Sequence, residues 1–124
     1  MTFTRKLALG FAAVRGLYGI ALAAAPGRVG TSWLGEAAAA RSVHVALRGL
    51  AARDLALAGG TIDAAMRPAP LEPWLLGSIG SDLSDIASTL LAGDAVPRRA
   101  RIGTLALAGT SVLAAGALVA IGDR

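Results

Sequence analysis

The stretch IGTLALAGTSVLAAGALVAIG, residues 102–122, contains no charged residue. At ~1.5 Å of rise per residue, a helix of this length crosses the ~30 Å hydrocarbon core of a bilayer. The stretch therefore predicts a transmembrane helix. We therefore expect the other apolar segments of the chain to lie in the same membrane.

The composition is typical of a membrane protein. Of the 124 residues, 55% are apolar and 16% are charged, whereas soluble domains carry about 25% charged residues. The mean hydropathy is +0.63. This composition predicts an integral membrane protein. Abundant Ala, Gly and Arg indicate a high-GC genome, and we expect the plasma membrane of a bacterium. The chain has no cysteine, which excludes disulfides and thiolate metal sites.

Proline and glycine divide the chain into four long segments. Pro26-Gly27 ends the first segment, Gly59-Gly60 ends the second, and Pro73 begins the third. A secretory signal peptide is the alternative for the first segment, but an arginine inside its apolar region argues against one. The expected helices cover about residues 5–25, 37–60, 73–92 and 101–122.

The connections between these segments are short, so neighbouring helices are expected to be antiparallel. The sequence therefore predicts an all-α fold. We expect this fold to be a four-transmembrane-helix antiparallel bundle that forms a single integral membrane domain over residues 1–124.

Six charged residues fall near the middle of the first three predicted helices. A charged residue at a helix centre costs about 2.5 to 3.5 kcal/mol on an insertion scale, so six that faced lipid singly would cost on the order of 15 to 20 kcal/mol. We therefore expect them to face inward and to neutralise one another. They are Arg15, Arg48, Arg53, Asp54, Asp82 and Asp85.

Helical phase predicts which of these groups meet. Residues advance by about 100° along a helix, so Ser81, Asp82 and Asp85 share one polar stripe of the third helix. This stripe is predicted to form the acidic wall of a buried cavity opposite Arg15 and Arg48. In the second helix, Arg41, His44 and Arg48 share a stripe, while Arg53 and Asp54 point more than 100° away from Arg48. Tyr18 lies on the same face of the first helix as Arg15.

An acid–base site is the first interpretation of this cluster, because carboxylates and guanidiniums in the membrane interior mark functional sites. A structural salt-bridge network that sets helix register is the alternative, with Arg53 and Asp54 each pairing to its own neighbour. His44 is also compatible with a packed or interfacial residue. The candidate catalytic residues are Asp82, Asp85 and Asp54, and the candidate substrate-binding residues are Arg15, Tyr18, Arg48, Arg53, His44 and Ser81.

Several other classes of site are not expected. Asp82 and Asp85 could offer two oxygens to a metal, but nearby arginines oppose a divalent cation, so we predict no metal site. The chain has no glycine-rich phosphate loop, nucleophile elbow or dinucleotide fingerprint, and we predict no cofactor. Although the net charge is +4, no basic face with interleaved aromatic residues is present, so nucleic acid is not an expected partner.

The pattern LRGLAARDLALAGG, residues 47–60, is followed by a helix that holds Asp82 and Asp85. Together they resemble the small four-helix DoxX-like membrane proteins of unknown function that are common in actinobacteria. The resemblance extends from Leu7 to Ile121. It implies four helices around a polar interior, and it implies no established activity or catalytic residue.

Three functions remain open. In the first, the protein binds a lipophilic small molecule in the bilayer and catalyses acid–base chemistry on it, such as isomerisation, cyclisation or epoxide opening. In the second, it is a small proton-coupled transporter. In the third, it is a non-catalytic subunit of a membrane complex. Lys and Arg are divided evenly between the two predicted ends of the bundle, so the positive-inside rule gives no orientation, and a dual-topology antiparallel homodimer stays open.

Overall fold

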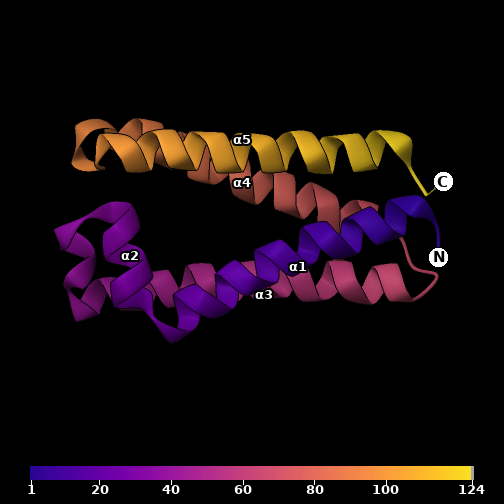
Figure 1. Ribbon diagram of the computed structural model, residues 1–124, viewed down its shortest axis with the longest axis horizontal. Coiled ribbons are helices and arrows are strands. Elements are labelled where there is room, and N and C mark those ends of the chain that lie inside the picture. Colours follow the sequence, from indigo (N-terminus) through magenta and orange to yellow (C-terminus); the bar gives the residue numbers. More distant parts are fainter. Residues whose placement is uncertain (124) are drawn as a thin grey trace.

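In the computed structural model, which describes residues 1–123, all regular secondary structure is helical, and this confirms the all-α prediction. Four long helices lie antiparallel to their chain neighbours, and both termini lie at one end of the molecule (Figure 1). The elements are α1 (Phe3–Ala24), α2 (Pro26–Leu34), η1 (Glu36–Ala39), α3 (Arg41–Met66), α4 (Glu72–Ala92), η2 (Gly93–Ala95) and α5 (Arg98–Ile121).

The helix boundaries differ from the prediction mainly around α2 and α3. The second predicted helix, about 37–60, begins as α3 only at Arg41, because Glu36–Ala39 form η1. Pro26 ends α1, but it also occupies the first turn of a further short helix, α2, which lies across one end of the bundle (Figure 1). Proline fits this position because its missing N–H would have no helical partner there. The glycine pair at 59–60 does not end α3, which continues to Met66. Instead, the ring of Trp74 on α4 packs directly over Gly60, where only a residue without a Cβ leaves room.

The long helices are arranged as two pairs. α1 packs along α3, and α4 packs along α5, with far less contact between the pairs. Small residues bring α1 and α3 close together, since a Cβ on Gly19 would lie 3.3 Å from the backbone oxygen of Ala51. One apolar cluster joins the two pairs at one end of the bundle, and a second apolar cluster packs α1, α2, η1 and α3 together at the other end.

One apolar cluster lies at the end that carries the termini, and its buried residues are Ala8, Ala64, Ala65, Leu71, Leu75, Ala115 and Leu118. The other lies at the α2 end, with Leu22, Ala38, Leu47 and Ala51 buried. Between these two clusters, the centre of the bundle is polar.

Large apolar side chains cover much of the outer surface of α1, α4 and α5. Val14 is 71% exposed, Leu91 is 88% exposed and Leu113 is 76% exposed. α1 and α5 are both long and apolar enough to cross a membrane, and most of each helix is exposed rather than buried. Among residues 1–123, α3 and α4 do not meet the same criterion, because they carry most of the charges of the polar centre.

Candidate functional site

Arg15 is the centre of the polar interior. Its Nη1 donates a hydrogen bond of 3.0 Å to Oδ1 of Asp54 on α3. Its Nη2 donates to Oδ2 of Asp82 on α4 at 2.6 Å and to Oγ of Ser111 on α5 at 3.2 Å. All the charged partners are buried, with side-chain exposures of 9% for Arg15, 6% for Asp54 and 8% for Asp82. A single guanidinium from α1 therefore joins the other three long helices.

A second arginine extends this network toward the surface. Arg53 on α3 binds Asp85 on α4 with both nitrogens of its fork, at 3.1 Å from Nη1 to Oδ1 and 2.9 Å from Nη2 to Oδ2. The same Nη2 lies 3.3 Å from Oδ1 of Asp54. Two-point pairing of this kind fixes the relative position of the two side chains. Oδ1 of Asp54 thus accepts hydrogen bonds from both arginines and links them.

Together these groups form one continuous series of ionic and hydrogen-bonded contacts, which we name the Arg/Asp chain. Its members, in order of contact, are Asp85, Arg53, Asp54, Arg15, Asp82 and Ser111. Each member lies near the middle of its own helix, so the chain crosses the bundle at mid-height. It ends where Ser111 donates a hydrogen bond of 2.5 Å to Asp82.

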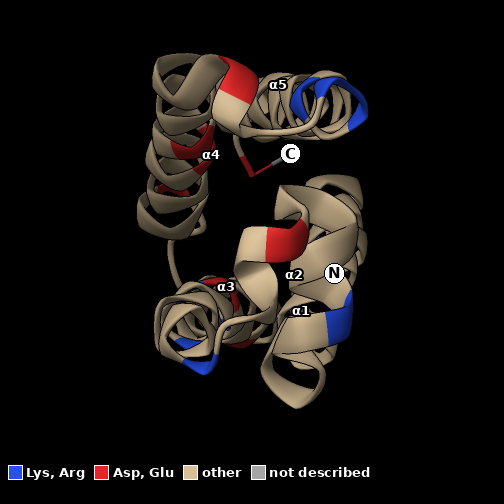
Figure 2. Cartoon of the chain, turned by 90° about the vertical axis from the view of Figure 1, so that its left-hand side faces the viewer, with Lys and Arg blue, Asp and Glu red and all other residues tan. Residues whose placement is uncertain are grey.

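The Arg/Asp chain crosses the gap between the two helix pairs. Arg15 and Arg53 come from the α1/α3 pair, and their partners Asp82 and Asp85 come from the α4/α5 pair. In Figure 2, acidic residues of α4 lie on the side that faces the interior of the bundle. The two helix pairs make few contacts with each other compared with the contacts inside each pair, and these ion pairs are among them.

The charges of the Arg/Asp chain do not cancel. It contains two guanidiniums and three carboxylates, so the ionised set carries one excess negative charge. An excess charge in a poorly solvated interior is costly. A single proton or monovalent cation would bring the set to neutrality.

A cavity of about 240 Å³ adjoins one end of the Arg/Asp chain. Asp85 lines it, and its side chain is 23% exposed. Trp33 of α2 also lines it, and the indole Nε1 donates a hydrogen bond of 2.7 Å to Oγ1 of Thr104. The complete lining is Trp33, Leu34, Asp85, Ser88, Thr89, Ala92 and Val96. The lining is mostly apolar with a few polar groups, which is typical of small-molecule sites.

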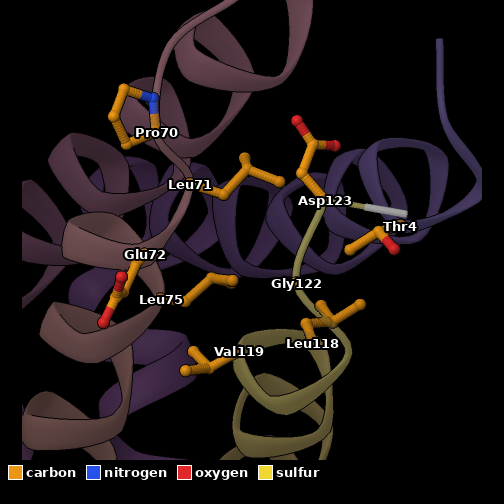
Figure 3. Close-up of a pocket in the computed structure, with 9 residues that line it drawn as sticks. All are labelled: Thr4, Pro70, Leu71, Glu72, Leu75, Leu118, Val119, Gly122 and Asp123. Carbon is orange, nitrogen blue, oxygen red and sulfur yellow. The ribbon is translucent and has the colours of Figure 1, made fainter.

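A second cavity, of about 210 Å³, lies at the end that carries the termini (Figure 3). Leu75 and Val119 project into it from α4 and α5, and Asp123 lies at its rim. The Asp123 carboxylate accepts hydrogen bonds from Arg5, which hold its pKa below the ordinary value of 3.8. No member of the Arg/Asp chain lines this cavity.

Arg5 holds that end of the bundle together. Its Nη1 donates to the backbone oxygens of Ala64 and Arg67, at 2.5 Å and 2.6 Å, and its Nη2 donates to that of Ala69 at 3.0 Å. Nη2 also donates to Asp123 at 2.6 Å. These carbonyls include unpaired groups at the C-terminal end of α3, where a cation is favourable. Arg5 thus binds the first helix to the α3–α4 connection and to the C-terminal segment.

The structure corrects the predicted position of Arg48. This residue is exposed on the outer side of α3, where its Nε donates a long hydrogen bond of 3.4 Å to the backbone oxygen of Ala23. The prediction that Arg48 faces Asp82 and Asp85 is therefore wrong, while the predicted pairing of Arg15 with Asp82 is confirmed. Arg53 takes the place expected for Arg48. The buried face of α3 is the one that carries Leu47, and Arg48 lies 100° from it.

The other predicted residues lie around the Arg/Asp chain without joining it. His44 Nε2 is 2.9 Å from the backbone oxygen of Ala38, so it donates a structural hydrogen bond near α2. Tyr18 is 41% exposed, and within residues 1–123 it makes no hydrogen bond to any member of the Arg/Asp chain. Ser81 is buried beside Asp82, and its Oγ has no hydrogen-bond partner among the described residues.

Two residues at the site were missed by the sequence prediction. Ser111 closes the Arg/Asp chain, and Trp33 walls the cavity next to Asp85. Ser111 did carry a signal, because it is a polar residue at the centre of an otherwise apolar helix. Trp33 carried none, since its position depends on the turn at Ala25 that starts α2.

Comparison with known proteins adds no family assignment. The chain matches no family model, no curated protein and no solved structure.

Proposed function

We propose that this chain is an integral membrane protein of a bacterial plasma membrane that binds a lipophilic small molecule beside Asp85 and catalyses acid–base chemistry on it. Isomerisation, cyclisation and epoxide opening are the reactions that this site fits. The observation that carries the proposal is the position of Asp85, which belongs both to the Arg/Asp chain and to the wall of an apolar cavity.

The membrane placement is supported by the distribution of apolar and charged groups. α1 and α5 are long and apolar enough to cross a bilayer. α4 has 21 residues and α3 has 26, so at ~1.5 Å per residue both reach across ~30 Å of hydrocarbon. Four of their central charges, Arg53, Asp54, Asp82 and Asp85, face inward and are paired, as expected for ionised groups inside a membrane. We propose that all four long helices span the membrane.

Asp85 is the carboxylate that a substrate can reach. Asp54 and Asp82 are buried, and each is bound to Arg15, so they are suited to hold Arg15 in place rather than to touch a ligand. Among residues 1–123, Asp85 is paired only with Arg53, and its partly exposed side chain lines the cavity. We assign Asp85 the role of general acid or base, and Arg53 the role of keeping its partner ionised between proton transfers.

The excess negative charge of the Arg/Asp chain supports proton binding. One proton neutralises the set, and Asp85 at the exposed end is the member that can exchange this proton with a ligand. The cavity of about 240 Å³ is smaller than the ~300–1,000 Å³ of typical ligand pockets. The substrate is therefore either small or leaves part of its length outside the cavity, in the lipid.

Proton-coupled transport is the second candidate, and the same proton site favours it. The series of carboxylates and guanidiniums runs from the cavity into the centre of the bundle without a break. A cargo entering at Asp85 would exchange for its proton. A non-catalytic role in a membrane complex is the remaining alternative. The DoxX-like resemblance is compatible with all three, because it implies an architecture and no activity.

The experiment compares purified protein in detergent with protein in sealed vesicles. Lipophilic compounds extracted from the host membrane are incubated with each, and products are identified by mass spectrometry. Catalysis predicts products in detergent that disappear in Asp85→Asn, a variant that keeps an oxygen for Arg53. Ser84→Ala is the matched control, since Ser84 is exposed and does not line the cavity. Proton-linked uptake in vesicles with no product in detergent would instead establish transport.

A further inference from the structure

The outward face of α3 differs from the outer faces of the other long helices. Where α1, α4 and α5 expose large apolar side chains, the middle of α3 exposes Gly49, Ala52, Ala56 and Gly59. These residues follow one another at steps of three or four and so form a straight stripe. We name this stripe, with the residues that flank it, the α3 face. Its members are Val45, Arg48, Gly49, Ala52, Ala56, Gly59, Asp63 and Met66, all exposed.

The α3 face is flat and open. A Cβ added at Gly49 or at Gly59 would meet nothing within 4 Å. Small residues in such a row let two helix backbones approach closely inside a membrane, where close packing replaces the hydrophobic effect as the driving force. A partner helix would therefore fit against this stripe without any change to the protomer.

Charge on the same face shows what kind of partner it fits. Arg48 is exposed, and its Nε donates one long hydrogen bond to a backbone oxygen of α1. It lies five residues from Arg53, which is about 8 Å along the helix axis from the mid-height layer. A lone guanidinium facing lipid at that depth is strongly unfavourable. Figure 2 shows basic residues on the side of α3 that faces away from the other helices. The face thus requires an acidic partner.

An acidic residue lies at the other end of the same face. Asp63 is exposed, and one of its oxygens, Oδ1, is 2.9 Å from Nε of Arg67. Its second oxygen can accept from another donor. Between Val45 and Met66 the α3 face therefore carries one cation, Arg48, and one anion, Asp63, with small residues between them. The exposed Arg41 and Arg67 flank the face at its two ends. If two copies of the α3 face are placed antiparallel, the cation of each copy therefore lies opposite the anion of the other.

We propose that the α3 face binds the α3 face of a second copy of this chain in antiparallel orientation. With the two-fold axis next to Ala56, Arg48 of each copy lies opposite Asp63 of the other. In the same register Ala52 lies opposite Gly59, and Val45 lies opposite Met66 at the ends. One helix surface then supplies two intermolecular ion pairs, close backbone packing and apolar ends. Such a self-complementary contact closes a symmetric dimer.

An antiparallel α3 pair has a consequence for membrane orientation. The two-fold axis must lie in the membrane plane, so the two copies insert in opposite directions. This inference rests on the membrane placement proposed above. The distribution of Lys and Arg permits both orientations, because it is nearly even between the two ends. By position in the sequence, Arg5, Lys6, Arg67 and Arg124 flank the predicted helices on the side of the termini, and Arg28, Arg41, Arg98, Arg99 and Arg101 flank them on the other side.

Cysteine cross-linking in native membranes tests the register, and it is clean here because the chain has no cysteine of its own. In the antiparallel pair, Ala56→Cys lies next to its own copy and forms a disulfide-linked dimer under mild oxidation. Val45→Cys lies about 30 Å along the axis from its own copy, at ~1.5 Å per residue, and does not cross-link alone. It does cross-link when co-expressed with Met66→Cys. Leu113→Cys on α5 is the control for random collision.

Self-linking of Val45→Cys as efficient as that of Ala56→Cys would overturn the antiparallel arrangement in favour of a parallel one. Absence of cross-links at both positions would overturn the dimer and leave lipid or a different protein on the α3 face. Extraction of the protein from membranes by alkaline carbonate would refute the membrane placement by itself, whatever the cross-linking result. The Asp85 reaction is measured separately, so failure of either proposal is recognised independently.

Charge reversal tests the ion pairs. Arg48→Asp places two carboxylates opposite each other, and we expect at least a tenfold loss of the Ala56→Cys cross-linked dimer. The double variant Arg48→Asp with Asp63→Arg restores the opposite charges and should restore the dimer. Equal loss in the single and double variants would show that the residues act within one copy, and this would overturn the proposed pairing.

Discussion

Replacing Gly60 with alanine tests how closely α3 and α4 pack. A Cβ at this position would lie 2.5 Å from Cδ2 of Trp74 and still closer to Cε3 and Cζ3. Ordinary carbon contacts are about 3.5–4.0 Å, so the indole ring must move by about 1 Å or more. Overpacking of this kind costs about 1–3 kcal/mol, while alanine recovers about 0.8–1 kcal/mol of helix propensity relative to glycine.

The matched control is Gly80→Ala on α4, where a Cβ meets nothing within 4 Å. This variant keeps the gain in helix propensity without the clash, so the two variants should differ by the overpacking energy of about 1–3 kcal/mol. At roughly 4 °C per kcal/mol, Tm should differ by about 4–12 °C. Circular dichroism in one detergent measures both Tm values. Trp74→Ala should abolish the difference, because it removes the ring that clashes.

Equal Tm values for Gly60→Ala and Gly80→Ala would refute the close packing of Trp74 against Gly60. The same conclusion would follow if the difference survived in the Trp74→Ala background, because the ring would then not be the group that resists the Cβ. A Tm for Gly60→Ala above that of the unmodified protein would mean that the ring swings aside without cost.

Two further predictions concern the charged contacts. Arg15→Met should destabilise the protein by about 3–5 kcal/mol, because it removes the cation bound to two buried carboxylates. Arg28→Met, which removes an exposed arginine of α2, should cost less than a third of this, and chemical denaturation in detergent compares them. Because the pKa of Asp123 is lowered by its hydrogen bonds from Arg5, this contact stabilises the fold above pH 3.8 and is lost as the pH falls through the lowered pKa. Tm measured from pH 7 down to pH 2 should therefore fall more for the unmodified protein than for Asp123→Asn, and parallel curves would contradict the assignment.

Hydrophobicity and helical phase predicted the all-α fold and the inward position of Asp82. Phase was reliable in α4 because exposed leucines, at positions 76, 83, 90 and 91, mark its outer side, so the stripe of Ser81 and Asp82 faces inward. The pairing of Arg15 with Asp82 followed from the cost of a lone charge at that depth.

The same reasoning failed in α3. Both faces of this helix are rich in alanine and glycine, so apolar content does not distinguish its inner side from its outer side. The stripe of Arg41, His44 and Arg48 has helical spacing, but spacing alone does not tell which way a stripe faces. The inner face is defined by tertiary packing of Leu47 and Ala51. Similarly, Gly60 was interpreted as a helix end because the contact that requires glycine there comes from α4.

The split of the Arg/Asp chain between two helix pairs has a consequence for biogenesis. A nascent chain that has reached the end of α3 holds two guanidiniums of the network and one carboxylate, and the segment that follows holds the remaining two carboxylates. Neither half is electrically balanced until the other has entered the bilayer. The two halves, expressed as separate polypeptides divided between Arg67 and Leu71, should therefore each be degraded alone and accumulate only when they are made together.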